Sequence, residues 1–174
     1  MKQNNSYEIQ FSGLRQGLHD FQWKIDKLLF EAFNNNHFDD VKLNCSLNLE
    51  KKERLMNLYF TIEGQIKTIC DRCGEQLVLP LSLENKLIVR FAEENDFTDD
   101  EVVFLANNEH RLELGQFIYE FVMTGLPLRL VHDDGECDPS VDEFLEEEIK
   151  EETETNETMT DPRWEELKKI KNND

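Results

Sequence analysis

The stretch Cys70-Asp71-Arg72-Cys73-Gly74 lies near the middle of the chain, and the strand-like run Gln76-Leu77-Val78-Leu79 follows it. A Cys-x2-Cys turn brings two thiolates together from one tight loop, as in a zinc knuckle. Far downstream, His132 stands five positions before Cys137, so a second loop can offer an imidazole and a third thiolate. The sequence therefore predicts one tetrahedral site for structural zinc, with the ligands Cys70, Cys73, His132 and Cys137.

Two other interpretations of the paired thiols stay open at this point: a redox pair, and cysteines that bind no metal. A chain without a secretion signal keeps most thiols reduced in either case. A thioredoxin-type pair normally opens a helix after a strand, whereas Cys73 is followed by glycine and strand-like residues, which favours a zinc-knuckle hairpin. Cys45 stands apart in the alternating run Val41–Leu47, and this pattern predicts a buried core position for its side chain.

Alternating and β-branched runs predict that most of the chain forms strands. Helical spacing predicts a short helix after Asp26 and a second one from Gly115 to Thr124. Pro80 indicates an edge position or a bulge within its strand. The fold class is therefore α+β, with a curved, partly barrel-like antiparallel sheet and a few short helices. The expected strands cover residues 7–11, 18–25, 41–49, 55–69, 76–83, 86–91, 101–105 and 110–114, the first two as antiparallel neighbours.

The formal net charge of −19 is unevenly distributed over the 174 residues. Residues 1–132 carry 14 Lys and Arg against 21 Asp and Glu, whereas residues 133–174 carry 5 against 17. We therefore expect a single α+β domain over residues 1–141 and an acidic helix with a disordered linker over 142–160. A short amphipathic helix is expected over 161–174. Such acidity opposes non-specific binding to nucleic-acid phosphates.

The predicted C-terminal helix begins with Asp161 as its cap and presents Trp164 and Leu167 on roughly one face. So short a helix does not stand alone, so its apolar stripe docks on its own domain or in the groove of a partner. The start of the chain lacks the apolar stretch of a signal peptide, and no apolar run approaches the roughly 20 residues of a membrane helix. We therefore expect a cytoplasmic protein without a membrane partner.

Three segments of the chain carry a family resemblance: Cys70–Gly74, Leu126–Cys137 and the closing run that starts at Asp161-Pro162-Arg163-Trp164. Together they resemble the YceD-like family of bacterial large ribosomal RNA subunit accumulation proteins. The resemblance implies a non-enzymatic, cytoplasmic ribosome-biogenesis factor that supports the processing and accumulation of large-subunit rRNA. It also implies that Cys70, Cys73, His132 and Cys137 are the metal-binding set.

The expected partner is large-subunit rRNA or a basic ribosomal protein, and no small-molecule substrate is expected. An acidic tail suits a basic protein, because the two attract one another over a distance that salt shortens. For contact with RNA, the candidates are Arg72, Arg90 and Arg129, since guanidinium groups suit phosphate and could form a small basic patch.

The alternative function is that of a thiol- or metal-dependent enzyme that uses Cys70, Cys73 and His132. It requires an open coordination position or a reactive cysteine beside the histidine, together with a general base. The sequence has no notable Ser-His-Asp order, no phosphate-binding glycine-rich loop and no His-Glu-x-x-His motif. We therefore predict that the protein is not an enzyme.

Overall fold

The computed structural model describes residues 7–98, 102–137 and 140–141. Of these described residues, those up to Asp71 and those from Gln76 to Leu130 belong to one compact unit, and Arg72–Glu75 and those from Val131 onward belong to a second. The predicted acidic linker over 142–160 and the predicted helix over 161–174 lie outside the described residues. In the part of the chain that the structure describes, no helix is long and apolar enough to cross a membrane.

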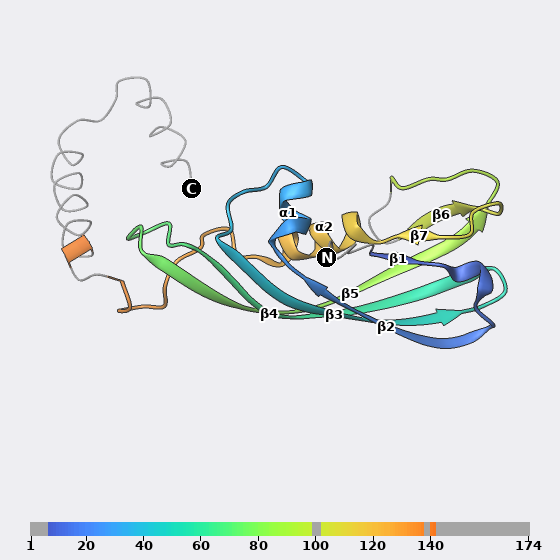
Figure 1. Cartoon of the computed structure of the whole chain (residues 1–174), viewed down its shortest axis with the longest axis horizontal. Coiled ribbons are helices and arrows are strands. Elements are labelled where there is room, and N and C mark those ends of the chain that lie inside the picture. The colour runs from blue at the N-terminus through green and yellow to red at the C-terminus, as the bar shows by residue number, and fades with distance from the viewer. Residues whose placement is uncertain (1–6, 99–101, 138–139, 142–174) are drawn as a thin grey trace, which may run out of the picture. The chain divides into compact units, whose positions relative to one another are not determined.

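A five-stranded sheet dominates the first unit, with the order β2-β3-β4-β5-β6 (Figure 1). Its long strands bend visibly along their length, as predicted, but the sheet is open and the expected partial barrel does not form. A second correction concerns strand direction, because β5 and β6 run parallel while the other neighbours are antiparallel. The strands are β2 (Gly17–Ile25), β3 (Asp40–Lys51), β4 (Leu55–Ile69), β5 (Gln76–Ala92) and β6 (Val102–Ala106).

Side chains alternate between the two faces of these strands, and the buried apolar set lies on one face, while the other face exposes side chains such as Tyr59, Ile69 and Val78. Two helices, α1 (Lys27–Ala32) and α2 (Gly115–Gly125), cover the buried face (Figure 1). Because the helices already bury the apolar face, the sheet does not need to close on itself to do so. Buried core residues of the central strands include Val41, Leu43, Cys45, Leu47, Leu49, Met56, Leu58, Phe60, Ile62 and Ile66.

The two helices predicted within the described residues both form, and local chemistry explains where the first one starts and stops. Asp26 caps α1, since its Oδ1 accepts a hydrogen bond of 3.1 Å from the backbone N–H of Leu28. Asn34 follows the helix at φ 59°, a left-handed conformation that asparagine tolerates better than most residues and that ends the helix. Ile118 and Val122 are fully buried and form the core-facing side of α2.

The first strand pairs differently from the prediction. The antiparallel partner of β1 (Glu8–Ile9) is β7 (Leu112–Glu113), not the run over residues 18–25. A 3₁₀ turn, η1 (Phe11–Gly13), separates the two segments and buries the Phe11 side chain. This turn directs the chain away from a hairpin with β2, which pairs with β3 instead.

The longest strands, β4 and β5, form the predicted hairpin. Their register runs from Leu55 opposite Arg90 to Ile69 opposite Gln76, so the knuckle sequence forms the connection between them. The sequence divided β5 into two strands, whereas it is continuous. Pro80 lies opposite Gln65 on a part of β5 that β6 does not reach, since β6 pairs only with residues 88–92. This is the edge position that a residue without an amide donor requires.

Candidate metal centre

The first arm of the candidate site is the turn between β4 and β5. Cys70 follows the last residue of β4, and its side chain is buried, while Cys73 is half-buried. Gly74 takes φ 74°, a left-handed value that glycine adopts at little cost and that lets the chain return into β5. The hairpin therefore presents two thiols from a turn whose ends are held by paired strands.

The second arm follows α2 along the chain. The residue that joins it to the first arm is Asp71, which donates its backbone N–H to the carbonyl oxygen of Leu130 at 2.7 Å. In return, the Asp71 carboxylate accepts the backbone N–H of Leu130, also at 2.7 Å. These two bonds fix the residue that lies two positions before His132. Sequence reasoning treated Asp71 only as a spacer in the Cys-x2-Cys motif.

A reversal of the chain between His132 and Cys137 forms the rest of the second arm. The backbone N–H of Glu136 donates to the carbonyl oxygen of Asp133 at 3.0 Å, and Gly135 takes φ 84°. This tight turn explains how an imidazole and a thiol five positions apart come to face one point. Cys137 is buried, and His132 is half-buried.

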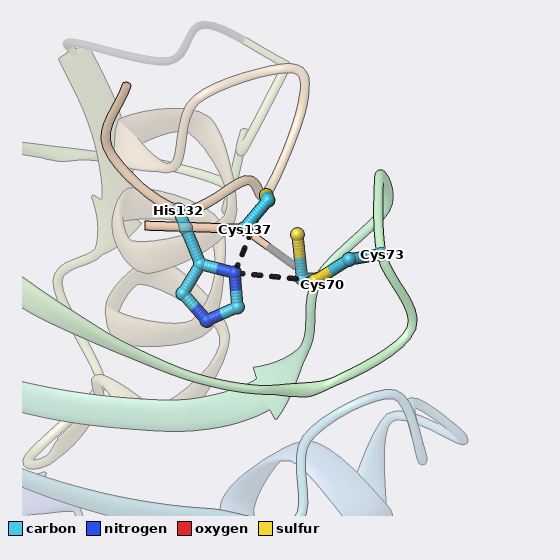
Figure 2. A group of neighbouring side chains, drawn as sticks. All are labelled: Cys70, Cys73, His132 and Cys137. Atoms are coloured by element: carbon cyan, nitrogen blue, oxygen red, sulfur yellow. Dashed lines mark hydrogen bonds between the residues drawn. The ribbon is translucent and has the colours of Figure 1, made fainter. Parts of the chain in front are cut away.

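The four donor atoms form a compact cluster (Figure 2), in which all of them lie within 4.8 Å of one another. The Nδ1 atom of His132 is 3.4 Å from the Sγ of Cys73 and 3.7 Å from the Sγ of Cys137. In a tetrahedral zinc site with ordinary bond lengths, a sulfur and a nitrogen ligand are roughly 3.6 Å apart. The structure thus brings together the predicted ligands in a cluster that could hold a metal ion.

The hydrogen-bonding capacity of the imidazole provides a test of that interpretation. Each ring nitrogen carries either one proton or one lone pair, so Nδ1 of His132 has a single direction in which to bond. Two sulfurs nevertheless converge on this one nitrogen (Figure 2). An ion at the centre of the cluster would receive one lone pair from each donor, and three thiolates with one imidazole are a donor set that zinc prefers. The residues present therefore fit zinc.

The remaining cysteine is chemically different. Cys45 is completely buried on β3, as its alternating sequence predicted. Burial raises the pKa of its thiol to about 12, because the thiolate would lose its hydration in the core. It therefore stays protonated and behaves as a small apolar residue.

The three arginines proposed for RNA contact are all exposed, but they do not lie together. Arg129 is adjacent to Leu130, which is bonded to the knuckle, and Arg72 is part of the knuckle itself. Arg90 lies opposite Leu55, at the other end of β4 from Ile69. At about 3.3 Å per residue, that separation is roughly 46 Å along the strand. Trp164 and Leu167, proposed for partner binding, lie outside the described residues.

Comparison with known proteins gives a match to one protein family. The family model described as large ribosomal RNA subunit accumulation protein YceD matches residues 58–171, more than half of the chain. The chain belongs to the YceD family. The match includes both arms of the Cys/His cluster, whereas β2, α1 and β3 precede it. No curated protein and no solved structure matches the chain.

Proposed function

We propose that this YceD-family protein is a non-enzymatic, cytoplasmic ribosome-biogenesis factor that supports the processing and accumulation of large-subunit rRNA. The observation that carries the proposal is the family match over residues 58–171, which spans the whole Cys/His cluster. The family's name refers to the accumulation of this RNA. The structure of the cluster supports the non-enzymatic part of the proposal, because four protein donors complete a tetrahedral shell and leave no position for a substrate.

The metal in this proposal is zinc, and its role is structural. Zinc bound by Cys70, Cys73, His132 and Cys137 would hold the β4–β5 turn to the segment that follows α2. Structural zinc sites bind with about 10–16 kcal/mol in small peptides, which is comparable with the total stability of an ordinary domain. Two short loops without regular secondary structure therefore gain a fixed arrangement from one ion.

For the partner, the proposal favours a basic ribosomal protein over RNA. The chain carries a net charge of −19, and affinity for a phosphate backbone comes largely from Lys and Arg. Arg90, on β5 opposite Leu55, also lies too far from the turn end of the β4–β5 hairpin to share a basic patch with Arg129. A protein rich in Lys and Arg is attracted by the same acidic charge that repels RNA, and binding would shield it before it meets rRNA.

The proposal is tested in cells by depleting the protein and measuring the ratio of large-subunit to small-subunit rRNA. Depletion should lower this ratio, and wild-type protein should restore it. Crosslinking in the same cells, followed by identification of the bound RNA and protein, should recover basic ribosomal proteins. An unchanged rRNA ratio, or recovery of neither ribosomal proteins nor rRNA, would contradict the proposal. Recovery of rRNA alone would replace the protein partner with RNA. Cleavage of precursor rRNA by the purified protein would show that it is an enzyme.

A further inference from the structure

A cleft of about 600 Å³ lies in the first unit, and no cysteine is among its described lining residues. One wall is the first half of α2, another is β7, and the loop after β5 contributes to its rim. Its volume falls within the range of pockets that hold a few side chains or a small ligand. Its aromatic and acidic lining residues are Phe33, Phe97, Phe117, Glu109, Glu113 and Glu120.

Three phenylalanines from distant segments line the cleft, together with the buried leucines Leu105 and Leu112. Phe97 is 52% exposed and Phe33 is 38% exposed, although large apolar side chains are normally buried. Phe97 and Phe117 have ring centroids 6.5 Å apart, so they form one aromatic surface. A set of rings that stays accessible in a well-packed unit is typical of a surface that a partner covers.

The charged part of the cleft is acidic. Glu109, Glu113 and Glu120 line it, and the one cationic side chain among its described lining residues is Arg111. The guanidinium of Arg111 lies 3.6 Å from a carboxylate oxygen of Glu8, so its charge is partly compensated outside the three glutamates. Asn95 donates to Glu109 at 3.3 Å, and Gln116 donates to Glu120 at 2.8 Å. These amides are neutral, so they orient the carboxylates and leave their charge in place.

One carboxylate of the cleft faces a second one across a strand pair. Glu113 on β7 is directly opposite Glu8 on β1, and like charges in such a position destabilise the pair, an effect that the Arg111 ion pair with Glu8 offsets only in part. A cation bound beside Glu113 would relieve this repulsion. The cleft therefore combines aromatic faces with an excess of negative charge that a positively charged group would stabilise.

We infer that this cleft binds an Arg- or Lys-containing segment of a basic partner protein. A guanidinium group can stack on the faces of Phe97 and Phe117 while it donates paired hydrogen bonds to a neighbouring carboxylate. RNA phosphate would be repelled by the same glutamates. The inference rests on the proposed function, because the segment would belong to the basic protein proposed above, and it adds the surface on which that protein docks.

The test measures binding of a fluorescent 12-residue peptide that alternates Arg and Leu to the zinc-loaded, full-length chain, by fluorescence anisotropy. Glu120→Gln should weaken binding roughly tenfold, as expected for the loss of one charge-assisted hydrogen bond. Phe97→Ala should weaken it roughly fivefold through the loss of a cation–π contact. Both side chains are at the surface, so these variants are expected to fold.

Each variant has a matched control on the open face of the sheet. Glu63→Gln on β4 also removes one exposed negative charge, and Tyr59→Ala removes an aromatic ring that is 43% exposed. These controls should change the affinity less than twofold. Equal losses in the controls and in the cleft variants would overturn the inference, because binding would then follow net charge alone. Absence of any peptide binding would overturn it too.

Two competitors identify the class of ligand. An excess of oligouridylate RNA, or of spermidine at equal charge, should displace the peptide far less effectively than the unlabelled peptide does. Displacement by either one at the same concentration would overturn the inference in favour of RNA or of a polyamine.

Crosslinking in cells separates the inference from the proposed function. If Glu120→Gln and Phe97→Ala recover basic ribosomal proteins as well as wild type, the cleft assignment fails while the family role stands. If the peptide binds but no ribosomal component is recovered in cells, the proposed function fails instead.

Discussion

Loss of the metal should lower the free energy of unfolding by about 4 kcal/mol. An ion bound by Cys73 and His132 closes a loop between residues 59 positions apart. Thiolates also bind zinc in the unfolded chain, so part of the binding energy cancels and the ion acts as a cross-link. The chain-entropy relation for a cross-link of this length gives about 4 kcal/mol near room temperature, because the bound ion limits how far the unfolded chain can separate these residues. This loss is a large fraction of the 5–15 kcal/mol by which domains are usually stable.

The perturbation is Cys73→Ser, compared with wild type in urea denaturation followed by circular dichroism, with and without a chelator. Wild type should contain about one zinc per chain and should lose about 4 kcal/mol when the chelator is added. Cys73→Ser should start from the lower stability, hold little zinc and respond weakly to the chelator. The variant tests the ligand and the chelator tests the ion, so agreement between them assigns the stabilisation to the site.

Cys45→Ala is the matched control, because it removes the cysteine that is not part of the cluster. Its cost should be about 1 kcal/mol from a small cavity in the core. Its zinc content and its response to the chelator should equal those of wild type, since Cys45 lies on β3 and is not part of the cluster. The reasoning would be refuted if wild type kept its full stability in the chelator, or if Cys73→Ser responded to the chelator as strongly as wild type.

Three further predictions follow from individual residues. Asp71→Ala removes the carboxylate that positions the second arm, so it should weaken zinc affinity roughly tenfold in a competition titration, and an unchanged affinity would show that this carboxylate does not position the arm. Gly64→Ala should cost about 3 kcal/mol or more in urea denaturation, because Gly64 has φ +149° and a Cβ there would collide with the carbonyl oxygen of Lys42. Gly13→Ala, where no atom lies within 4 Å of the new Cβ, should be close to neutral, so equal costs at both positions would contradict this explanation. Burial raises the pKa of Cys45 from 9.0 to about 12. A thiol whose pKa is higher in the folded state contributes its full stabilisation only at a pH below its pKa in the unfolded chain. The free energy of unfolding should therefore fall as pH rises above about 9, and this part of the fall should be absent in Cys45→Ala.

The Cys/His cluster could be predicted from the sequence, because its residue types have a specific chemistry. Cysteine and histidine are scarce in this chain. Because Cys70, Cys73, His132 and Cys137 fall in two short segments, few arrangements bring these four side chains to one ion. The β4–β5 hairpin was predictable for a similar reason, because long alternating runs on both sides of a Cys-x2-Cys-Gly turn specify a strand pair. The buried state of Cys45 followed from the same alternation.

Pairing between short or distant strands was not predictable in the same way. The two residues of β1 show no more periodicity than many loops, and their partner β7 lies more than 100 positions away. Parallel and antiparallel strands have the same alternation of side chains, so the direction of β6 relative to β5 cannot be predicted from the alternation of apolar and polar residues. The partial barrel was wrong because strand count and curvature do not reveal that two helices will cover the apolar face.

The acidic cleft was also beyond the reach of sequence reasoning. Phe33 follows α1, Phe97 lies in the loop after β5, and Phe117 belongs to α2. Phe33 and Phe117 fall in helical patterns that indicate ordinary core positions, and Phe97 falls in an acidic run that indicates a solvated turn. Only the folded chain places the three around a common hollow with three glutamates. Asp71 was missed for the same reason, since its partner Leu130 is 59 positions away.

The order of the two arms along the chain has a consequence during translation. Cys70 and Cys73 leave the ribosomal exit tunnel first, and His132 follows 59 positions after Cys73. At roughly 5–20 residues per second, about 3–12 s pass in which the nascent chain offers only two of the four ligands of the cluster. A two-thiolate site holds zinc weakly compared with the complete set, so firm capture of the ion marks a chain whose synthesis has passed the second arm.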